Sequence, residues 1–265
     1  MNASQPSARP LTSKELTDIP VGHYHRVMES GHPVRRAWHL LKFTRVLDLC
    51  MEAPGAILDI GCFAGSLLSR ASEAQYPRQL GVDILPEQLA FANESFGTPF
   101  RRFEHIDGLR SLRRLEPGFD YATCVEVIEH LAPAEIRTLF VEVARLLTPG
   151  RGRFVLSTPN YSSTWPLLEL LLNRVSDVDY SEQHITRFTY FGLERKLREI
   201  VPEIDKYFRF EVKTTTHFVS PFLAVLGVDV ATKVGSWVPH SRWGSPLGNL
   251  VLVRLARNDR PFDEA

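Results

Sequence analysis

The sequence predicts an α/β protein with a mostly parallel sheet covered by helices on both faces. Short apolar runs of the kind found in buried strands alternate with helical patterns over most of residues 33–160, and this alternation favours a parallel sheet. Proline opens several of the helical patterns, at Pro33, Pro86 and Pro133, where its missing N–H is least costly. A chain of 265 residues can also bury the large core that such a sheet requires.

The regular elements can be followed along the first half of the chain. A helix is expected at 32–52, because apolar side chains recur there at near-helical spacing, and it ends at Pro54-Gly55. A buried strand at 56–60, a glycine-bearing turn at 61–65 and a helix from 66 to about 74 come next. The pattern then predicts, in order, a strand at 79–84, a helix at 86–96, strands at 100–105 and 119–125, a helix at 134–147 and a strand at 153–157.

The second half of the chain is less regular. An apolar helical insert is expected at 165–175, and a helix at 189–201 with Thr189 as its N-cap. Strands are expected at 206–216 and 248–256, with an apolar stretch at 218–238 between them. Residues 1–20 are polar and are predicted to be a disordered lead, whereas 21–265 form one domain with a core at about 33–160 and further elements at about 161–247.

Composition narrows the class of protein. Lys plus Arg and Asp plus Glu both number 31, so no excess charge points to nucleic acid or to an anionic membrane as a partner. A basic stretch between Arg101 and Arg114 is interpreted as the solvated rim of a loop and helix. The three cysteines form no CxxC pair, and no apolar run has the length of a signal peptide or a membrane span. These features predict a cytoplasmic protein.

The turn after the first strand predicts a ligand site. Asp59 ends that strand, and Gly61, Cys62, Phe63 and Gly65 follow it. In open α/β sheets, ligands bind beyond the carboxyl ends of the strands, and glycines let the backbone pass close to them. A carboxylate at this place repels a pyrophosphate but attracts the ammonium group of a methionine moiety. The turn therefore favours S-adenosylmethionine over NAD.

Two further acids follow the next two strands. Asp83, with Ile84 behind it, ends the second strand, where a carboxylate can accept both ribose hydroxyls of an adenosine. Asp107 follows the third strand and is placed to accept the adenine amino group, with Ile106 and Gly108 framing the ring. Together with Asp59, these residues predict a complete adenosine-donor site.

Five segments in this order resemble the motifs of class I S-adenosylmethionine-dependent methyltransferases: ILDIGCFAGSL, LGVDI, IDG, FDYATCVEVIEHL and LLTPGRGRFVLSTPN. The resemblance covers roughly residues 33–200, and within the class this stretch is most similar to the methyltransferase type 11 or 23 group. It implies a Rossmann-like seven-stranded sheet with an antiparallel last strand, S-adenosyl-L-methionine as cofactor, and Val125 beside the donor. One position departs from the family, because Phe63 stands where the middle glycine belongs, and we expect it to narrow the turn.

The residues after the fourth strand predict the reacting end of the site. Glu126, Glu129 and His130 share a face within one turn, and His184 follows later in the chain. The pattern resembles ubiquinone-biosynthesis O-methyltransferases and small-RNA 3′-terminal 2′-O-methyltransferases. The resemblance to the latter implies that these four residues bind Mg²⁺ or Mn²⁺. The alternative is a metal-free site in which Glu126 and Glu129 assist His130 as general base.

The acceptor side is less specified. Residues 165–172 read as a lid, a membrane contact like that of ubiquinone-type relatives, or a helix packed on the sheet edge. The leading hypothesis is O-methylation of a hydroxyl on a small-molecule, glycan or lipid-linked acceptor, with a peripheral membrane location for a lipid-linked one. The alternatives are an RNA 2′-O-methyltransferase, which the neutral charge disfavours, and a non-catalytic donor-binding scaffold.

Overall fold

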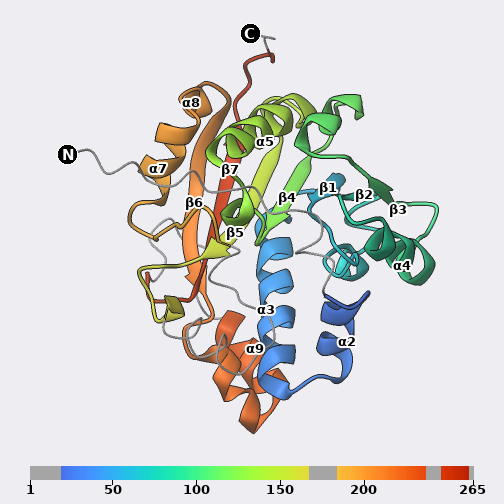
Figure 1. Cartoon of the computed structure of the whole chain (residues 1–265), viewed down its shortest axis with the longest axis vertical. Coiled ribbons are helices and arrows are strands. Elements are labelled where there is room, and N and C mark those ends of the chain that lie inside the picture. Colours follow the sequence, from blue (N-terminus) through green and yellow to red (C-terminus); the bar gives the residue numbers. More distant parts are fainter. Residues whose placement is uncertain (1–18, 167–183, 237–245, 263–265) are drawn as a thin grey trace.

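The computed structural model describes residues 19–166, 184–236 and 246–262. Seven strands form one sheet in the order β3-β2-β1-β4-β5-β7-β6 (Figure 1). Their bounds are β1 Ala56–Ile60, β2 Arg78–Asp83, β3 Arg101–His105, β4 Tyr121–Val125, β5 Arg153–Pro159, β6 Phe208–Thr216 and β7 Leu250–Arg257. β1 to β5 pair in parallel, and β7 runs antiparallel to both β5 and β6. This topology confirms the predicted seven-stranded Rossmann-like sheet.

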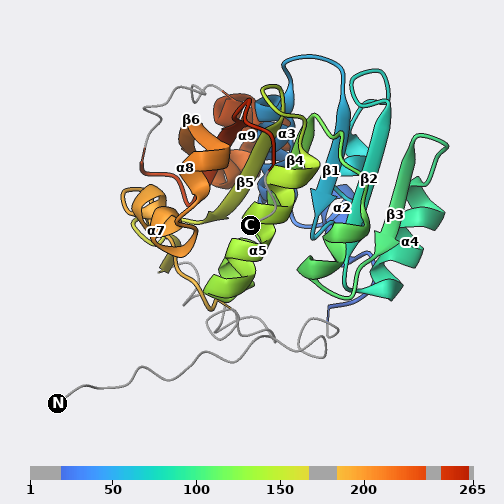
Figure 2. The same cartoon turned by 90° about the horizontal axis from the view of Figure 1, so that it is seen from above.

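Helices cover both faces of this sheet (Figure 2). The described α-helices are α2 His23–Ser30, α3 Pro33–Cys50, α4 Pro86–Phe96, α5 Pro133–Leu146, α7 Leu193–Ile200, α8 Ile204–Tyr207 and α9 Val228–Ser236. Short 3₁₀ segments are η1 Leu68–Arg70, η2 Leu109–Arg114, η3 Ile128–His130 and η4 Ser220–Leu226. Pro33, Pro86 and Pro133 each begin an α-helix, as their fixed φ predicts.

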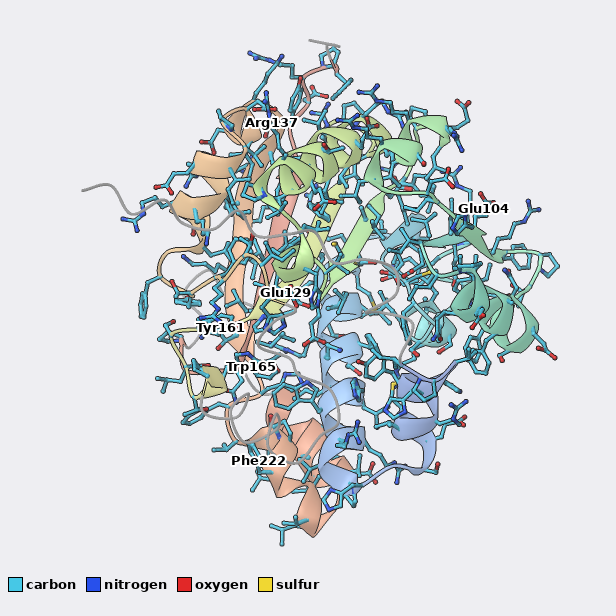
Figure 3. All side chains as sticks on the ribbon, in the orientation of Figure 1. Glu104, Glu129, Arg137, Tyr161, Trp165 and Phe222 are labelled. Atoms are coloured by element: carbon cyan, nitrogen blue, oxygen red, sulfur yellow. The ribbon has the colours of Figure 1, made fainter. Side chains whose placement is uncertain are left out.

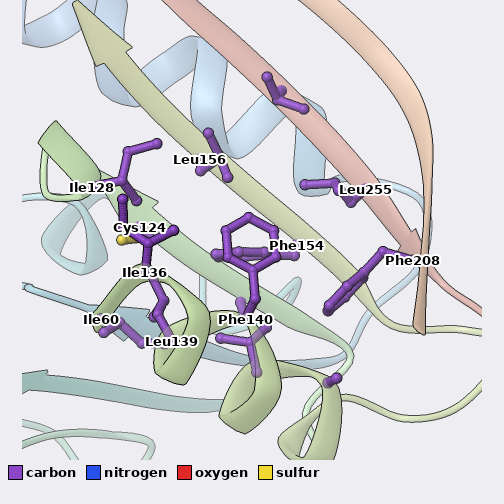
Figure 4. Close-up of a cluster of buried hydrophobic side chains, with 14 of the residues drawn as sticks. Ile60, Cys124, Ile128, Ile136, Leu139, Phe140, Phe154, Leu156, Phe208 and Leu255 are labelled. Atoms are coloured by element: carbon purple, nitrogen blue, oxygen red, sulfur yellow. The ribbon is translucent and has the colours of Figure 1, made fainter. Parts of the chain in front are cut away.

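The core lies on the two faces of the sheet because successive strand residues point to opposite sides. On one face, Leu58 and Ile60 of β1 pack with α5, α7 and α8. Figure 4 shows Phe140 of α5 between Phe154 and Phe208, with ring centroids 5.3 and 6.0 Å away. On the other face, Ile57 packs with α3 and α4. α3 therefore lies on the sheet face opposite α5.

Two predicted helices differ in the structure. The segment expected to be helical at 66–74 forms only the three-residue η1. One of its serines bonds to nearby backbone, since Ser69 Oγ donates to the Ser66 carbonyl at 2.9 Å, and such a bond competes with a helix. The helix expected from 189 begins at Leu193 with Gly192 as N-cap, because the Thr189 hydroxyl accepts the Gly192 N–H and closes a preceding turn.

A cap covers one end of the sheet. We define the cap as residues 19–40 and 218–236, which comprise α2, the first half of α3, η4 and α9. Figure 1 shows α2 and α9 flanking α3 at this end of the molecule. Small side chains, Ala37 of α3, Ala224 of η4 and Ala231 of α9, form its buried centre. These small side chains let α3, η4 and α9 pack closely against one another.

Some predicted segments fall largely outside the described residues. The polar lead at 1–20 does so up to residue 18, and the apolar insert at 165–175 from residue 167 onward. No helix in the ranges 19–166, 184–236 and 246–262 has the length and apolarity needed to cross a bilayer.

Candidate functional site

A cavity of about 1260 Å³ lies between the cap and the carboxyl ends of β1, β2 and β4. It brings together nearly all of the residues predicted from the sequence. Those at the donor end are Asp59, Gly61, Cys62, Phe63, Asp83, Ile84, Ile106, Asp107, Gly108 and Val125, and those at the other end are Glu126, Glu129, His130 and His184. Gly65 is the exception and lies outside the cavity wall.

The two glycines of the turn act in packing. Both have a left-handed backbone, with φ of 75° at Gly61 and 76° at Gly65. A Cβ at Gly65 would lie 2.7 Å from the ring of Phe103, and one at Gly61 would lie 2.5 Å from Val127. Gly65 therefore lets the turn pack against β3, whereas Gly61 also lines the cavity.

Phe63 closes the turn in place of the expected glycine. Its φ of 47° is in the left-handed region, which a bulky side chain seldom adopts. Its N–H donates to Asp83 Oδ2 at 2.7 Å, and its ring lies 5.3 Å from that of Tyr24 in α2. Phe63 thus joins the turn to the cap across the donor end of the cavity.

The Asp83 carboxylate is fixed by two backbone N–H groups and keeps acceptor positions for a ligand. The Leu85 N–H donates to its Oδ1 at 3.0 Å, and the Phe63 N–H donates to Oδ2, so each oxygen keeps a further lone pair. Burial raises the pKa of Asp83, and the backbone donors oppose that rise. Two vicinal hydroxyls, as in a ribose, fit the remaining acceptor positions.

Asp107, the third acid predicted at the donor end, lies beside an open space at Gly108, which we call the Gly108 cradle. Asp107 is solvent-exposed and pairs with Arg114 at 3.5 Å. No atom lies within 4 Å of the place that a Cβ of Gly108 would occupy. Ile106 lines the cavity next to this space. A flat ring can therefore lie against Gly108 and Ile106, with Asp107 at its edge.

Asp59 is the most deeply buried of the three acids at the donor end. It is buried, and the Thr123 hydroxyl donates to its Oδ1 at 2.7 Å. Burial raises the pKa of Asp59 to about 7, although the Thr123 hydrogen bond opposes this rise. A cationic ligand group would compensate for burial of the carboxylate. Asp59, Asp83 and the Gly108 cradle together fit the ammonium, ribose and base of the expected donor.

Glu126 is paired with a lysine that the sequence analysis missed. Lys42 of α3 is buried and forms an ion pair with Glu126, whose φ of 54° is left-handed. Burial raises the pKa of Glu126, but the Lys42 ammonium outweighs this, so the pKa lies below its ordinary value. The helix also carries Arg35, Arg36 and Arg45, so nothing in the sequence distinguished Lys42 from these residues.

The other three predicted metal ligands converge. One ligand atom from each of Glu129, His130 and His184 lies within 4.8 Å of the others. The His184 Nδ1 and the Tyr161 hydroxyl share a hydrogen bond of 2.6 Å. Burial raises the pKa of Glu129 to about 8, with the Glu126 carboxylate adding to the rise. Glu126 is bonded to Lys42 and is not part of this cluster.

The remaining wall of the cavity is aromatic. Trp38 of α3 lies 5.9 Å from Trp165 between ring centroids, and Phe222 of η4 lies farther along. Figure 3 shows Glu129, Trp165 and Phe222 following one another from the centre of the molecule toward the cap. His217 donates from Nε2 to the Trp38 carbonyl at 2.7 Å and so fixes this part of α3. Sequence patterns did not indicate Trp38 or His217.

The basic stretch is mostly the exposed rim that was expected, with Arg101 as the exception. Arg101 is buried and donates to Gln79 Oε1 at 2.7 Å and to two backbone carbonyls. Arg113 pairs with Glu142 at 3.0 Å, whereas Arg114 pairs with Asp107. Arg101 is therefore a structural residue that joins β2 and β3.

The fold and the donor end of the cavity define a class I S-adenosylmethionine-dependent methyltransferase. A family model described as a methyltransferase domain matches residues 34–200, and the chain belongs to this family. A comparison with curated proteins finds no match.

Solved structures share the fold at low sequence identity. The N-methyltransferase NodS from Bradyrhizobium japonicum, with bound S-adenosylhomocysteine, is 14% identical with a TM-score of 0.57, covering 94% of this chain and 98% of that one. Magnesium protoporphyrin IX methyltransferase from Synechocystis, also with S-adenosylhomocysteine, is 15% identical with a TM-score of 0.55, covering 89% and 93%. The methyltransferase domain of bacterial CtHen1 is 17% identical with a TM-score of 0.51, covering 82% and 98%.

Proposed function

We propose that this methyltransferase acts on a hydroxyl oxygen of an acceptor that has an apolar body. The observation that carries the proposal is the cluster of Glu129, His130 and His184 in the same cavity as Asp59 and Asp83. Transfer to a neutral hydroxyl requires removal of its proton, and imidazoles are the side chains best suited to accept it near neutral pH. An amine that is already neutral near pH 7 can attack without first losing a proton, so it has less need of such a cluster.

The proposed step uses the cavity as follows. The bound S-adenosylmethionine supplies an electrophilic methyl carbon. The acceptor oxygen attacks that carbon, and the carbon–sulfur bond breaks with its electron pair left on sulfur. Where no metal ion occupies the cluster, the hydroxyl proton passes to the His130 imidazole. Trp38, Trp165 and Phe222 would hold the apolar body of the acceptor and align its oxygen, which is the main requirement of a displacement at carbon.

We also propose that the cluster holds a divalent metal ion. Glu129 Oε2 is buried with no hydrogen-bond partner among the described residues, so a cation would satisfy it. The bond between His184 Nδ1 and Tyr161 is typical of metal-binding histidines, whose second nitrogen is held by a partner. Two imidazoles and one carboxylate favour Mn²⁺ over Mg²⁺. Such an ion would lower the pKa of the acceptor hydroxyl.

The test is calorimetric titration of S-adenosylhomocysteine and of Mn²⁺, with Mg²⁺ for comparison, followed by methyl-transfer assays on catechols, vicinal diols and simple phenols. We expect saturable binding of both ligands and transfer to catechols or diols that EDTA abolishes. Glu129→Gln should lose the Mn²⁺ signal and at least about tenfold in rate, while S-adenosylhomocysteine still binds. Glu104→Gln, on an exposed residue of β3 away from the cavity, should change neither (Figure 3).

Other outcomes point elsewhere. Binding of S-adenosylhomocysteine with no Mn²⁺ signal and full activity in EDTA would refute the metal and leave His130 as general base. Transfer only to amines would refute O-methylation. Donor binding without transfer to any acceptor would favour the donor-binding scaffold, and absence of donor binding would contradict the methyltransferase function.

One observation supports RNA 2′-O-methylation as a second candidate. The convergence of Glu129, His130 and His184 matches three of the four positions implied by the small-RNA family. Against it, Arg101 is buried, and Arg113 and Arg114 are paired with acids, so these residues supply little of a phosphate track. A short RNA with a free 3′-terminal diol, added to the acceptor panel, decides between the two candidates.

A further inference from the structure

The cap carries an exposed apolar ridge. Its members are Phe218, Val219, Phe222, Val225, Leu226 and Val230, each at least 42% exposed, and we call these residues the lip. They lie within η4, the residues just before it and the start of α9. Residues 218–228 contain no charged side chain. Contiguous exposed apolar surface of this kind marks a place where another body binds.

The orientation of η4 is the reverse of that in an ordinary surface helix. Its inner side is small, because Ala224 is only 2% exposed where it packs with Ala37 of α3. Its outer side is large and apolar, with Val225 at 73% and Leu226 at 74% exposed. A surface helix normally turns polar side chains outward. Val225 and Leu226 therefore do little for the fold and are placed for contact outside the chain.

The lip adjoins the opening of the active-site cavity. Phe222 is partly exposed and also lines the cavity, and Figure 3 shows it beyond Trp165 at the cap end. Trp38 and Trp165 continue the apolar wall inward toward Glu129. An apolar acceptor could pass along this wall from the lip to the reacting end. A protein that covered the lip would obstruct the same route.

Charge on the cap favours an anionic surface. The cap holds four basic residues, Arg26, Arg35, Arg36 and Lys233, and two acidic residues, Glu29 and Asp229, whereas the whole chain is neutral. Arg35 of α3 also lines the cavity, so one of these cations belongs to the cavity wall. An apolar segment flanked by basic residues is the combination that holds a peripheral protein in a membrane interface.

We propose that the lip docks this protein onto anionic phospholipid membranes, so that lipid-linked acceptors enter the cavity directly from the bilayer. The choice of acceptor rests on the proposed O-methyltransferase function. The docking surface is a separate claim and is tested without methyl transfer.

The experiment is flotation of the full chain with vesicles of phosphatidylcholine containing a minority of phosphatidylglycerol, in parallel with vesicles of phosphatidylcholine alone. We expect binding that is stronger on the anionic vesicles and weaker at high salt. Leu226→Glu should lower the partition coefficient about tenfold, because it replaces inserted apolar surface with a like charge. Phe191→Glu is the matched control: Phe191 is 72% exposed but lies outside the cap, and its change should leave partition unchanged.

Two further measurements keep the test decisive. Both variants should keep the melting temperature of the parent chain and its calorimetric affinity for S-adenosylhomocysteine. Loss of thermal stability in Leu226→Glu would mean that the lip packs within the chain, and would overturn the proposal. Three other results would also overturn the proposal. They are an equal loss of partition in both variants, no binding of the parent chain to vesicles of either kind, and a dimer that Leu226→Glu dissociates. Donor binding that persists in those cases would leave the proposed function standing.

Discussion

Single acids in this site are tuned to different charge states by their neighbours. Glu126 and Glu129 are three residues apart, yet the Lys42 ammonium lowers the pKa of Glu126, whereas burial and the Glu126 charge raise that of Glu129. Environments that separate two carboxyl pKa values in this way are typical of sites that perform chemistry. Glu126 thus remains a fixed anion, and Glu129 needs a cation or a proton.

Asp59 gives a prediction about pH. Its pKa of about 7 belongs to the protein without ligand, and we expect the ammonium of the donor to bind the ionised form. Ionised Asp59 predominates above that pKa, so affinity for S-adenosylhomocysteine should be full above about pH 8 and should fall as pH decreases through 7, by up to about tenfold per unit. Calorimetric titrations between about pH 6 and about pH 8 measure this.

The matched variant is Asp59→Asn, which keeps an acceptor for the Thr123 hydroxyl but carries no charge. It should bind the donor weakly and with a flat pH dependence over the same range. A parent affinity that does not change with pH would contradict the role of Asp59 as the ammonium partner.

At the scale of elements, local sequence predicted most of the sheet. Strands such as Tyr121–Val125 and helices such as Pro86–Phe96 combine an apolar pattern with proline or glycine punctuation, and both signals are local. The helix predicted at 66–74 is mostly absent because Ser69 bonds to nearby backbone, and periodicity does not reveal such a contact. Gly65 was assigned to the donor because a glycine pattern does not show whether the absent side chain would meet a ligand or Phe103.

We therefore predict that a side chain added at Gly65 destabilises the fold through packing. Gly65→Ala should lower the free energy of unfolding by about 3 kcal/mol, since it adds a left-handed strain of about 1–2 kcal/mol to a clash with Phe103 and Ala92. Gly150→Ala is the control: its φ of 73° matches the 76° of Gly65, but its nearest neighbour is the flexible Asp259 carboxylate. It should cost only about 1 kcal/mol. Urea unfolding of the ligand-free variants measures both, and equal losses would contradict the packing role.

On the scale of the whole molecule, the site joins segments that are distant in the chain. The acids at the ends of β1 and β2 could be predicted because parallel strands bring their carboxyl ends to one edge. Lys42 and Trp38 could not, because only tertiary packing places α3 beside β4 and β5. The cap is likewise built from 19–40 and 218–236, and its apolar pattern alone does not distinguish inward from outward side chains.

This arrangement predicts that the donor stabilises the cap together with the sheet. Tyr24 of α2 lines the cavity and contacts Phe63 of the turn, so a ligand that packs against both rings should hold α2 in place. At about 100 times its Kd, S-adenosylhomocysteine should raise the free energy of unfolding by about 2.7 kcal/mol. It should also slow amide hydrogen exchange in His23–Ser30.

Asp83→Ala serves as the control for this prediction. It removes the ribose acceptor and leaves the N–H groups of Phe63 and Leu85 unpaired, so the ligand-free protein should lose about 1–3 kcal/mol. The decisive quantity is therefore the increase in the free energy of unfolding that S-adenosylhomocysteine causes in each protein. This increase should vanish in Asp83→Ala. If S-adenosylhomocysteine stabilises the parent protein but exchange in α2 is unchanged, the cap does not close over the donor, and the cavity opens to solvent along α2 rather than only at the lip.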